Sequence, residues 1–131
     1  MISCCCWEIE CHTTTGTNNT ASGYQALRNN TTASNNTAIG SRSAYENTTG
    51  TWNTAIGYRA LKSNTTGSYN TVGGSAALFS NTTGNSNTAN GIFALYSNTT
   101  GACNTASGYS ALYANTTGHS NIAVGSQSLY K

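Results

Sequence analysis

The feature that most constrains the fold of this chain is a sequence repeat with a period of 17 residues. An Asn recurs at this spacing from residue 19 to residue 121, and a Gly follows each Asn four places later, without an insertion. One typical unit, residues 53–69, reads Asn-Thr-Ala-Ile-Gly-Tyr-Arg-Ala-Leu-Lys-Ser-Asn-Thr-Thr-Gly-Ser-Tyr. Because strict self-similarity at a short period is the signature of repeat proteins, the chain is predicted to form a solenoid.

The length of the unit decides between helical and β-sheet coils. A helical repeat needs about 33 residues, whereas two strands of about five residues and two turns fit into 17. In the unit above, strands are expected at 53–57 and 58–62, with a turn at 63–67 and a second bend at the Gly. Ala and Leu favour a helix, so one helical turn per coil is the local alternative. The predicted fold class is all-β, a parallel β-solenoid (β-roll) of 17-residue coils.

Stacked coils place identical residues about 4.8 Å apart along the axis, so each position of the unit becomes a ladder. Asn side chains in a ladder can hydrogen-bond to one another along the stack. A column of Ala allows close packing, and each buried Leu contributes about 1.5 to 3 kcal/mol. Because this core is thin, exposed Tyr and Leu surface is expected to drive self-association as a symmetric homo-oligomer. The predicted ladder residues are Asn19, Asn36, Asn53, Asn70, Asn87, Asn104, Asn121, Gly23, Gly40, Gly57, Gly74, Gly91, Gly108 and Gly125.

The first residues depart from the repeat and divide the chain into two parts. Residues 1–12 are interpreted as a degenerate N-terminal cap coil and residues 13–131 as the repeat array, because terminal repeats of solenoids are atypical. The cap contains a cysteine cluster beside His12, whose spacing is a poor match for the paired clips of a zinc site. We prefer the alternative that these thiols cap the open end, buried or as disulfides. The cluster consists of Cys4, Cys5, Cys6 and Cys11.

Charge and composition exclude several classes of function. Five Lys and Arg against three Asp and Glu give a formal net charge of +2, too small for a nucleic-acid or anionic-membrane footprint. No apolar run approaches the roughly 18 residues of a membrane span, and the first residues lack the basic and apolar regions of a secretion signal. The acids and histidines neither repeat nor form an acid–base pair. We therefore expect neither an enzyme nor a cofactor.

The unit resembles repeats of known surface proteins. Asn-Thr-Ala-Ile-Gly at 36–40 and 53–57, with Asn-Ile-Ala-Val-Gly at 121–125, resembles the head repeats of trimeric autotransporter adhesins. The longer string at 53–67 resembles the shaft repeats of phage tail fibres. The resemblance covers 13–131 and implies a left-handed parallel β-roll, assembled as a trimer and displayed on a cell or virion surface for adhesion. It also implies a cell-surface or carbohydrate receptor as partner.

A second Asn column begins the string Asn-Thr-Thr in six units. The string satisfies the acceptor pattern for N-glycosylation, so one interpretation is a stripe of sugars along the array. The same string suits a tight turn with side-chain-to-backbone hydrogen bonds, and this interpretation is preferred. The candidate glycosylation sites are Asn30, Asn47, Asn64, Asn81, Asn98 and Asn115.

Threonine and aromatic residues also recur in register. Columns of Thr on a flat solenoid face can order water, which would suit ice binding, although Thr also fits half-exposed strand and turn positions. Regular exposed aromatic residues mark interfaces, so packing between chains is preferred to stacking on sugars. The aromatic columns are Tyr45, Phe79, Tyr96, Tyr113 and Tyr130 in one position and Tyr24, Tyr58 and Tyr109 in another.

These patterns favour a non-catalytic structural or adhesive fibre segment that presents a repetitive polar surface and gains contact strength from repetition. The segment is expected outside the cell, on a cell surface or on a virion, as a trimer or end-to-end fibre. The alternatives are an ice-binding or glycan-binding solenoid and a glycosylated extracellular fibril subunit. An intrinsically disordered, glycosylated spacer fits the composition but not the strict register.

Overall fold

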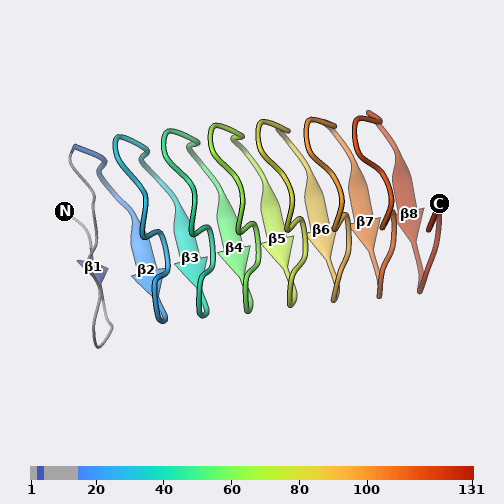
Figure 1. Cartoon of the computed structure of the whole chain (residues 1–131), viewed down its shortest axis with the longest axis horizontal. Helices are drawn as coiled ribbons and strands as arrows, with labels where there is room; N and C mark the ends of the chain where they lie inside the picture. The colour runs from blue at the N-terminus through green and yellow to red at the C-terminus, as the bar shows by residue number, and fades with distance from the viewer. Residues whose placement is uncertain (1–2, 5–14) are drawn as a thin grey trace.

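The chain winds into a solenoid whose strands form one parallel sheet (Figure 1). The computed structural model describes residues 3–4 and 15–131. Eight strands follow one another across the sheet in chain order, and Thr54 pairs with Thr71 as Ala55 pairs with Val72. The strands are β1 (Ser3–Cys4), β2 (Thr20–Ser22), β3 (Thr37–Ile39), β4 (Thr54–Ile56), β5 (Thr71–Gly73), β6 (Thr88–Asn90), β7 (Thr105–Ser107) and β8 (Ile122–Val124). The predicted all-β parallel solenoid is confirmed.

The predicted cap is described only in part. Its strand β1 pairs in parallel with β2, so that Cys4 lies beside Ala21 in the register of the array. The other residues of the predicted cap coil 1–12, namely 1–2 and 5–12, lie outside the described residues.

Each coil of the array contains one three-residue strand, and the prediction of a second strand is wrong. Within 53–69, extended structure covers β4 alone, and residues 58–63 form consecutive turns. Arg59 and Leu61 both have a φ of 54°, which takes the backbone out of the extended region. The local helical alternative is also wrong, since none of the residues that the structure describes is helical.

The residues with positive φ alternate with ordinary ones and turn the backbone N–H groups toward both neighbouring coils. The N–H of Arg59 donates to the carbonyl oxygen of Ser41 in the preceding coil at 3.0 Å. Two residues later, the N–H of Leu61 donates to the carbonyl oxygen of Ala77 in the following coil, also at 3.0 Å. The corresponding residues of other coils repeat this pattern. Each inner coil is therefore hydrogen-bonded on both sides, through turns as well as through strands.

The Gly that follows each of the strands β2 to β7 lies where neighbouring coils approach closely. Gly57 has a φ of 136°, a backbone conformation that residues other than glycine rarely adopt. A Cβ atom on Gly57 would lie 2.6 Å from the carbonyl oxygen of Gly74 in the next coil. The predicted second bend therefore lies at the Gly column, and the absence of a side chain permits the contact between backbones.

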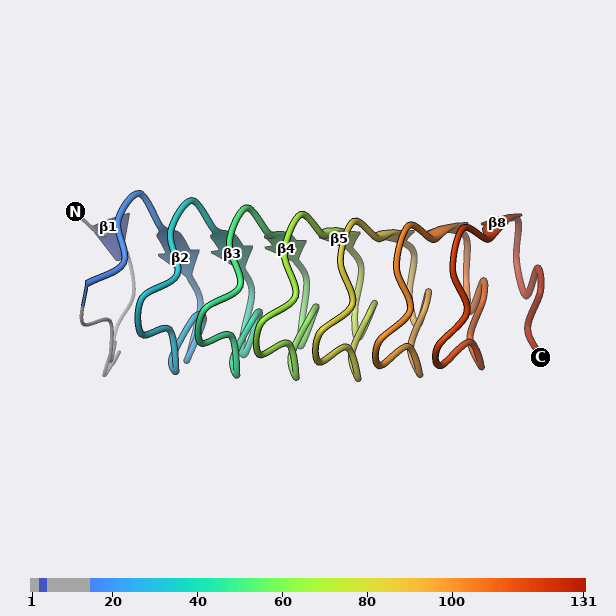
Figure 2. The same ribbon diagram turned by 90° about the horizontal axis from the view of Figure 1, so that it is seen from above.

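The core is a narrow stack of small apolar side chains and Leu. In the unit at the centre of the array, Ala55, Ala60 and Leu61 are fully buried. Other coils repeat these positions, with Val72 in place of an Ala and Ala44 in place of a Leu. The coils lie in single file along the axis (Figure 2). Because the core is one coil thick, every outward position of the unit becomes a surface column along the array.

Candidate functional site

The first Asn column, defined by the ladder asparagines Asn19 to Asn121, is a hydrogen-bond ladder inside the solenoid. The side-chain oxygen of Asn53 accepts two hydrogen bonds from Asn70, one from its backbone N–H and one from its side-chain amide, both at 3.0 Å. The side-chain amide of Asn53 donates to the carbonyl oxygen of Gly67 at 2.9 Å. Because both ends of the amide are satisfied, the column stabilises the register between coils without leaving polar groups unpaired.

The second Asn column, defined by the Asn of each Asn-Thr-Thr string, forms a parallel ladder. The side-chain amide of Asn64 donates to the side-chain oxygen of Asn47 at 2.7 Å and to the carbonyl oxygen of Gly67 at 2.8 Å. The side-chain oxygen of Asn64 accepts from the amide of Asn81 at 2.8 Å. This geometry is that of the preferred interpretation, a turn closed by side-chain-to-backbone hydrogen bonds.

The side-chain nitrogens of the second Asn column are engaged in hydrogen bonds within the solenoid. An N-linked glycan would be attached to the side-chain nitrogen, which in Asn64 is fully buried and donates two hydrogen bonds. Asn115 is partly buried and its amide is also engaged, at 2.9 Å from the side-chain oxygen of Asn98. At all six candidate sites the side-chain nitrogen donates a hydrogen bond to a carbonyl oxygen within the solenoid, which favours the turn interpretation over the sugar stripe: Asn30, Asn47, Asn64, Asn81, Asn98 and Asn115.

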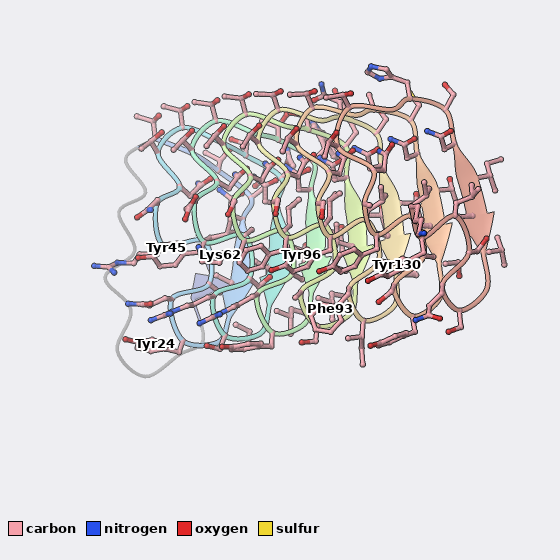
Figure 3. The ribbon with its side chains drawn as sticks, turned by 45° about the vertical axis from the view of Figure 1, so that its right-hand side comes forward. Tyr24, Tyr45, Lys62, Phe93, Tyr96 and Tyr130 are labelled. Atoms are coloured by element: carbon pink, nitrogen blue, oxygen red, sulfur yellow. The ribbon has the colours of Figure 1, made fainter. Side chains whose placement is uncertain are left out.

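One outward column forms a continuous ridge of stacked side chains along the turns (Figure 3). Ring centroids lie 5.1 Å apart between Phe79 and Tyr96 and 5.2 Å apart between Tyr96 and Tyr113, with the rings nearly parallel. Lys62 replaces a ring in this stack, and its Nζ lies 5.7 Å from the ring centroid of Tyr45 and 5.4 Å from that of Phe79. Stacking covers the ring faces and leaves mainly edges and hydroxyl groups open. The ridge consists of Arg28, Tyr45, Lys62, Phe79, Tyr96, Tyr113 and Tyr130.

The Lys, Arg and Glu side chains of the described part lie on the ridge or in turn residues near it, except Lys131, which follows Tyr130. The guanidinium carbon of Arg59 lies 4.9 Å from the ring centroid of Tyr58, a cation–π contact. Glu46 forms an ion pair with Lys62 at 2.9 Å. No such charge lies on the described strands, β1 to β8, so the sheet face and the ridge differ in chemistry.

Threonine forms columns on two faces. On the sheet, Thr54 pairs in register with Thr37 and Thr71. In the turn, the hydroxyl of Thr65 donates to the carbonyl oxygen of Thr82 at 3.0 Å, whereas Thr66 is exposed. The two adjacent threonines of the turn therefore have different roles, since the first bonds the next coil and the second faces solvent.

The cysteine and histidine candidates are only partly described. Cys5, Cys6 and Cys11 lie outside the described residues, as does His12, and Cys4 is described only as part of β1. Cys103 is exposed and free. His119 accepts a hydrogen bond on its Nδ1 from the backbone N–H of Ala102 at 3.1 Å. In the part of the chain that the structure describes, no three His, Cys, Asp or Glu residues are grouped closely enough to hold a metal ion.

Sequence reasoning missed one group of exposed aromatic residues. Trp52 and Tyr69 lie at equivalent positions of adjacent coils and are 57% and 62% exposed. In other coils this position holds only Asn, Ser or Cys, so two bulky residues in a column of small ones were the available signal.

Comparison with protein-family models, with curated proteins and with solved structures gives no match for this chain. Within the described ranges there is also no helix long and apolar enough to cross a membrane.

Proposed function

We propose that this chain is a non-catalytic fibre segment that provides length and stiffness and presents repeated surfaces for adhesion. The observation that carries the proposal is the continuity of hydrogen bonding between coils. In the central coils, Thr54, Leu61 and Thr65 each donate a backbone N–H to the next coil, at 2.9, 3.0 and 2.9 Å. Bending the array would lengthen such bonds, together with both Asn ladders, on one side of the solenoid.

The chemistry of the polar side chains supports a structural rather than a catalytic role. Most buried polar side chains belong to the two Asn columns, whose amides are paired within the solenoid. Glu46, the only acid among the described residues, is held in an ion pair with Lys62. A reaction needs a nucleophile, a base and a group that orients the base, and these side chains supply no such set.

We also propose that copies of the chain associate through the ridge and that the assembly is displayed outside the cell, on a cell surface or a virion. The ridge supports self-association because it is aromatic along its C-terminal half, from Phe79 to Tyr130. Its ring faces are already stacked, so a flat ligand finds few open faces there. A second copy can instead pack against ring edges and bond to the Tyr hydroxyl groups.

Native mass spectrometry and electron microscopy of the full chain test this proposal together. The expected result is a rod whose length follows the number of coils, in a homo-oligomer of which the trimer is the first candidate. Replacing Tyr96 and Tyr113 with Ser should release monomers that keep the β-sheet circular dichroism spectrum. A flexible particle, or one without a defined long axis, would overturn the stiffness on which the proposal depends.

Ice binding is a second candidate function, and one observation favours it. The sheet threonines pair with their equivalents from strand to strand, as Thr37 does with Thr54 and Thr88 does with Thr105, so hydroxyl groups recur at the strand spacing. An assay for inhibition of ice recrystallisation tests it. Activity that is lost when Thr54 and Thr71 are replaced with Lys supports ice binding, and an inactive wild-type chain excludes it.

A further inference from the structure

Trp52 and Tyr69 occupy backbone positions that do not suit them. Their φ values are 59° and 61°, in the left-handed region. Bulky side chains are rare there, whereas Asn and other small polar residues are tolerated. We call this position the bend column, and its other members are Asn18, Asn35, Ser86, Cys103 and Ser120.

Burial does not compensate for the unfavourable backbone. Both rings are more than half exposed, at 57% for Trp52 and 62% for Tyr69. Neither ring forms a stacking or cation–π contact with another described residue, in contrast to Tyr96 on the ridge. The fold sets this φ in every coil, since the N–H groups of Trp52 and Tyr69 donate to Ser34 and Thr51 of the preceding coils. Large exposed rings at a position that small polar residues suit better direct attention to what these rings bind.

The two rings extend a patch of exposed residues on the sheet face. Along one coil, Trp52, Ile56 and Tyr58 are exposed and Thr54 is half-buried, while Asn53 and Ala55 point inward and are buried. We call the outward residues of these coils the platform: Ile39, Trp52, Thr54, Ile56, Tyr58, Tyr69 and Thr71.

The platform combines apolar surface with open hydroxyl groups. Ile56 pairs with Ile39 on one side and with Gly73 on the other. Because Gly73 has no side chain, the side of Ile56 that faces the next coil is not covered by a neighbouring side chain. The hydroxyl groups of Thr54 and Thr71 have no hydrogen-bond partner within the described part of the chain. Arg59 lies over the ring of Tyr58, so the open ring faces of the platform are those of Trp52 and Tyr69.

The charge distribution selects a neutral ligand. The platform itself includes no Lys, Arg or Glu residue, and Arg59, which contacts it, lies over the ring of Tyr58 and away from Trp52 and Tyr69, which form no cation–π contact with a described residue. A polyanion would be attracted to the ridge instead. Sugar rings match the platform, because their C–H faces pack on aromatic rings and their hydroxyl groups bond to Thr hydroxyl groups.

A second copy of the chain fits the platform less well than a local ligand does. Copies packed side by side would need an apolar seam along the whole array. On the same face, the later coils carry Ser86, Asn90 and Ser107 at the positions that Trp52 and Ile56 occupy in the central coil. These polar residues separate the platform from the exposed Ile and Val of β8, so the apolar surface is interrupted along the array.

We propose that the platform is a binding site for a neutral saccharide chain, with Trp52 and Tyr69 as stacking residues and Thr54 and Thr71 as hydrogen-bonding residues. The proposal deepens the proposed adhesive function by naming the site and the class of receptor. It rests on that function for its biological role but not for its chemistry.

Neutral hexasaccharides of β-linked glucose, of N-acetylglucosamine and of mannose test the proposal with the full chain. In a Trp7→Phe background, Trp52 is the remaining tryptophan, so its fluorescence reports on the platform. We expect one of these saccharides to change the emission of Trp52. Isothermal titration calorimetry, which needs no tryptophan, measures the affinity of the wild type and of every variant. Replacing Trp52 and Tyr69 with Asn, the residue that Asn18 and Asn35 supply at this position, should weaken binding by about tenfold or more.

The same double variant provides a readout that a purely structural role would not give. Asn relieves the strain of the bend column, so the variant should unfold at a higher temperature while it loses the saccharide. Tyr109→Ser is the matched control, because it removes an exposed aromatic residue outside the platform, and it should leave binding unchanged.

Three outcomes would overturn the proposal. They are a wild-type chain that binds none of the three saccharides, a double variant that binds as well as the wild type, and a double variant that loses its oligomeric state instead of a ligand. The last outcome would assign the platform to a second copy. If saccharides fail to bind while the rod persists in the electron microscope, only the saccharide site falls, and the proposed fibre function stands.

Discussion

The side-chain amides of Asn53 and Asn64 donate hydrogen bonds to the same acceptor, the carbonyl oxygen of Gly67, at 2.9 and 2.8 Å. The two asparagines belong to one coil and are eleven residues apart in the sequence. Their shared acceptor links the two Asn ladders inside the coil, so that two distant parts of the coil are hydrogen-bonded to the same carbonyl group. It also satisfies a buried carbonyl group that no strand partner reaches.

The Asn64→Ala variant should be markedly less stable than the wild type. It removes two donated hydrogen bonds and the acceptor for Asn81, and it leaves buried polar atoms of the neighbouring coils with fewer partners. We expect the free energy of unfolding to fall by about 3 kcal/mol, as measured by urea denaturation.

Thr66→Ala is the matched control for Asn64→Ala. It changes an exposed residue of the same turn that takes part in neither Asn ladder, so it should alter the free energy of unfolding by less than about 0.5 kcal/mol. Equal stability of the two variants would contradict a stabilising role for the second Asn column.

Gly57→Ala should destabilise the array through its backbone. The added Cβ would lie 2.6 Å from the carbonyl oxygen of Gly74, at a φ of 136° that alanine rarely adopts. We expect a loss of at least about 2 kcal/mol in the free energy of unfolding, measured by thermal or urea denaturation.

Gly73→Ala is the matched control for Gly57→Ala. A Cβ there meets the side-chain oxygen of Asn90, the end of a side chain that can move, and other coils carry Ser, Ile, Asn or Val at this position. This variant should keep nearly the stability of the wild type. If both substitutions lower the free energy of unfolding by the same amount, the close approach of the backbones does not explain why the Gly column requires glycine.

Deletion of residues 54–70 should leave a shorter array of the same fold. The deletion removes one whole unit and joins Asn53 to Thr71, so each ladder continues across the junction. The rod should shorten by about 4.8 Å, as measured by small-angle scattering, with little change in the circular dichroism spectrum. Deletion of 54–69 shifts every later column by one place and should abolish cooperative unfolding. A tolerated frame shift would show that the register is not enforced.

Leu78→Ala should cost about 2 to 5 kcal/mol, because Leu78 is fully buried and its removal leaves a cavity between coils. Leu129→Ala offers a comparison in the same column, since Leu129 is 55% exposed. The free energy of unfolding of Leu129→Ala, measured by urea denaturation, should be close to that of the wild type. Equal losses would indicate that the Leu column stabilises the array by something other than burial.

The period of the sequence predicted the register of the sheet correctly, because identical residues can form ladders only when each coil has the same length. It predicted the strand of each coil less well. The length of the unit led to a second strand being expected at 58–62, yet Arg59 and Leu61 take positive φ values. Neither residue type favours that conformation. Hydrogen bonding to both neighbouring coils imposes it, and this constraint is not visible within a single unit.

The chemistry of the surface was predictable in part. The aromatic columns were identifiable from spacing alone, but their mutual stacking depends on side-chain directions that spacing does not specify. Asn64 matched an acceptor pattern for glycosylation as well as a turn, and only its burial separates the two interpretations. Trp52 and Tyr69 match no motif, because their significance lies in their backbone angles and exposure.

The hydrogen bonding of each coil to both neighbours has a consequence for how such a chain can change over time. The interior of a coil is specified by a few Asn, Ala, Leu and Gly residues, so its outward residues are free to vary independently of those in the next coil. New surfaces can thus arise one coil at a time, while recombination between near-identical units changes the length of the rod in whole steps. The length of the rod and the binding properties of its surface can therefore change independently of each other during evolution.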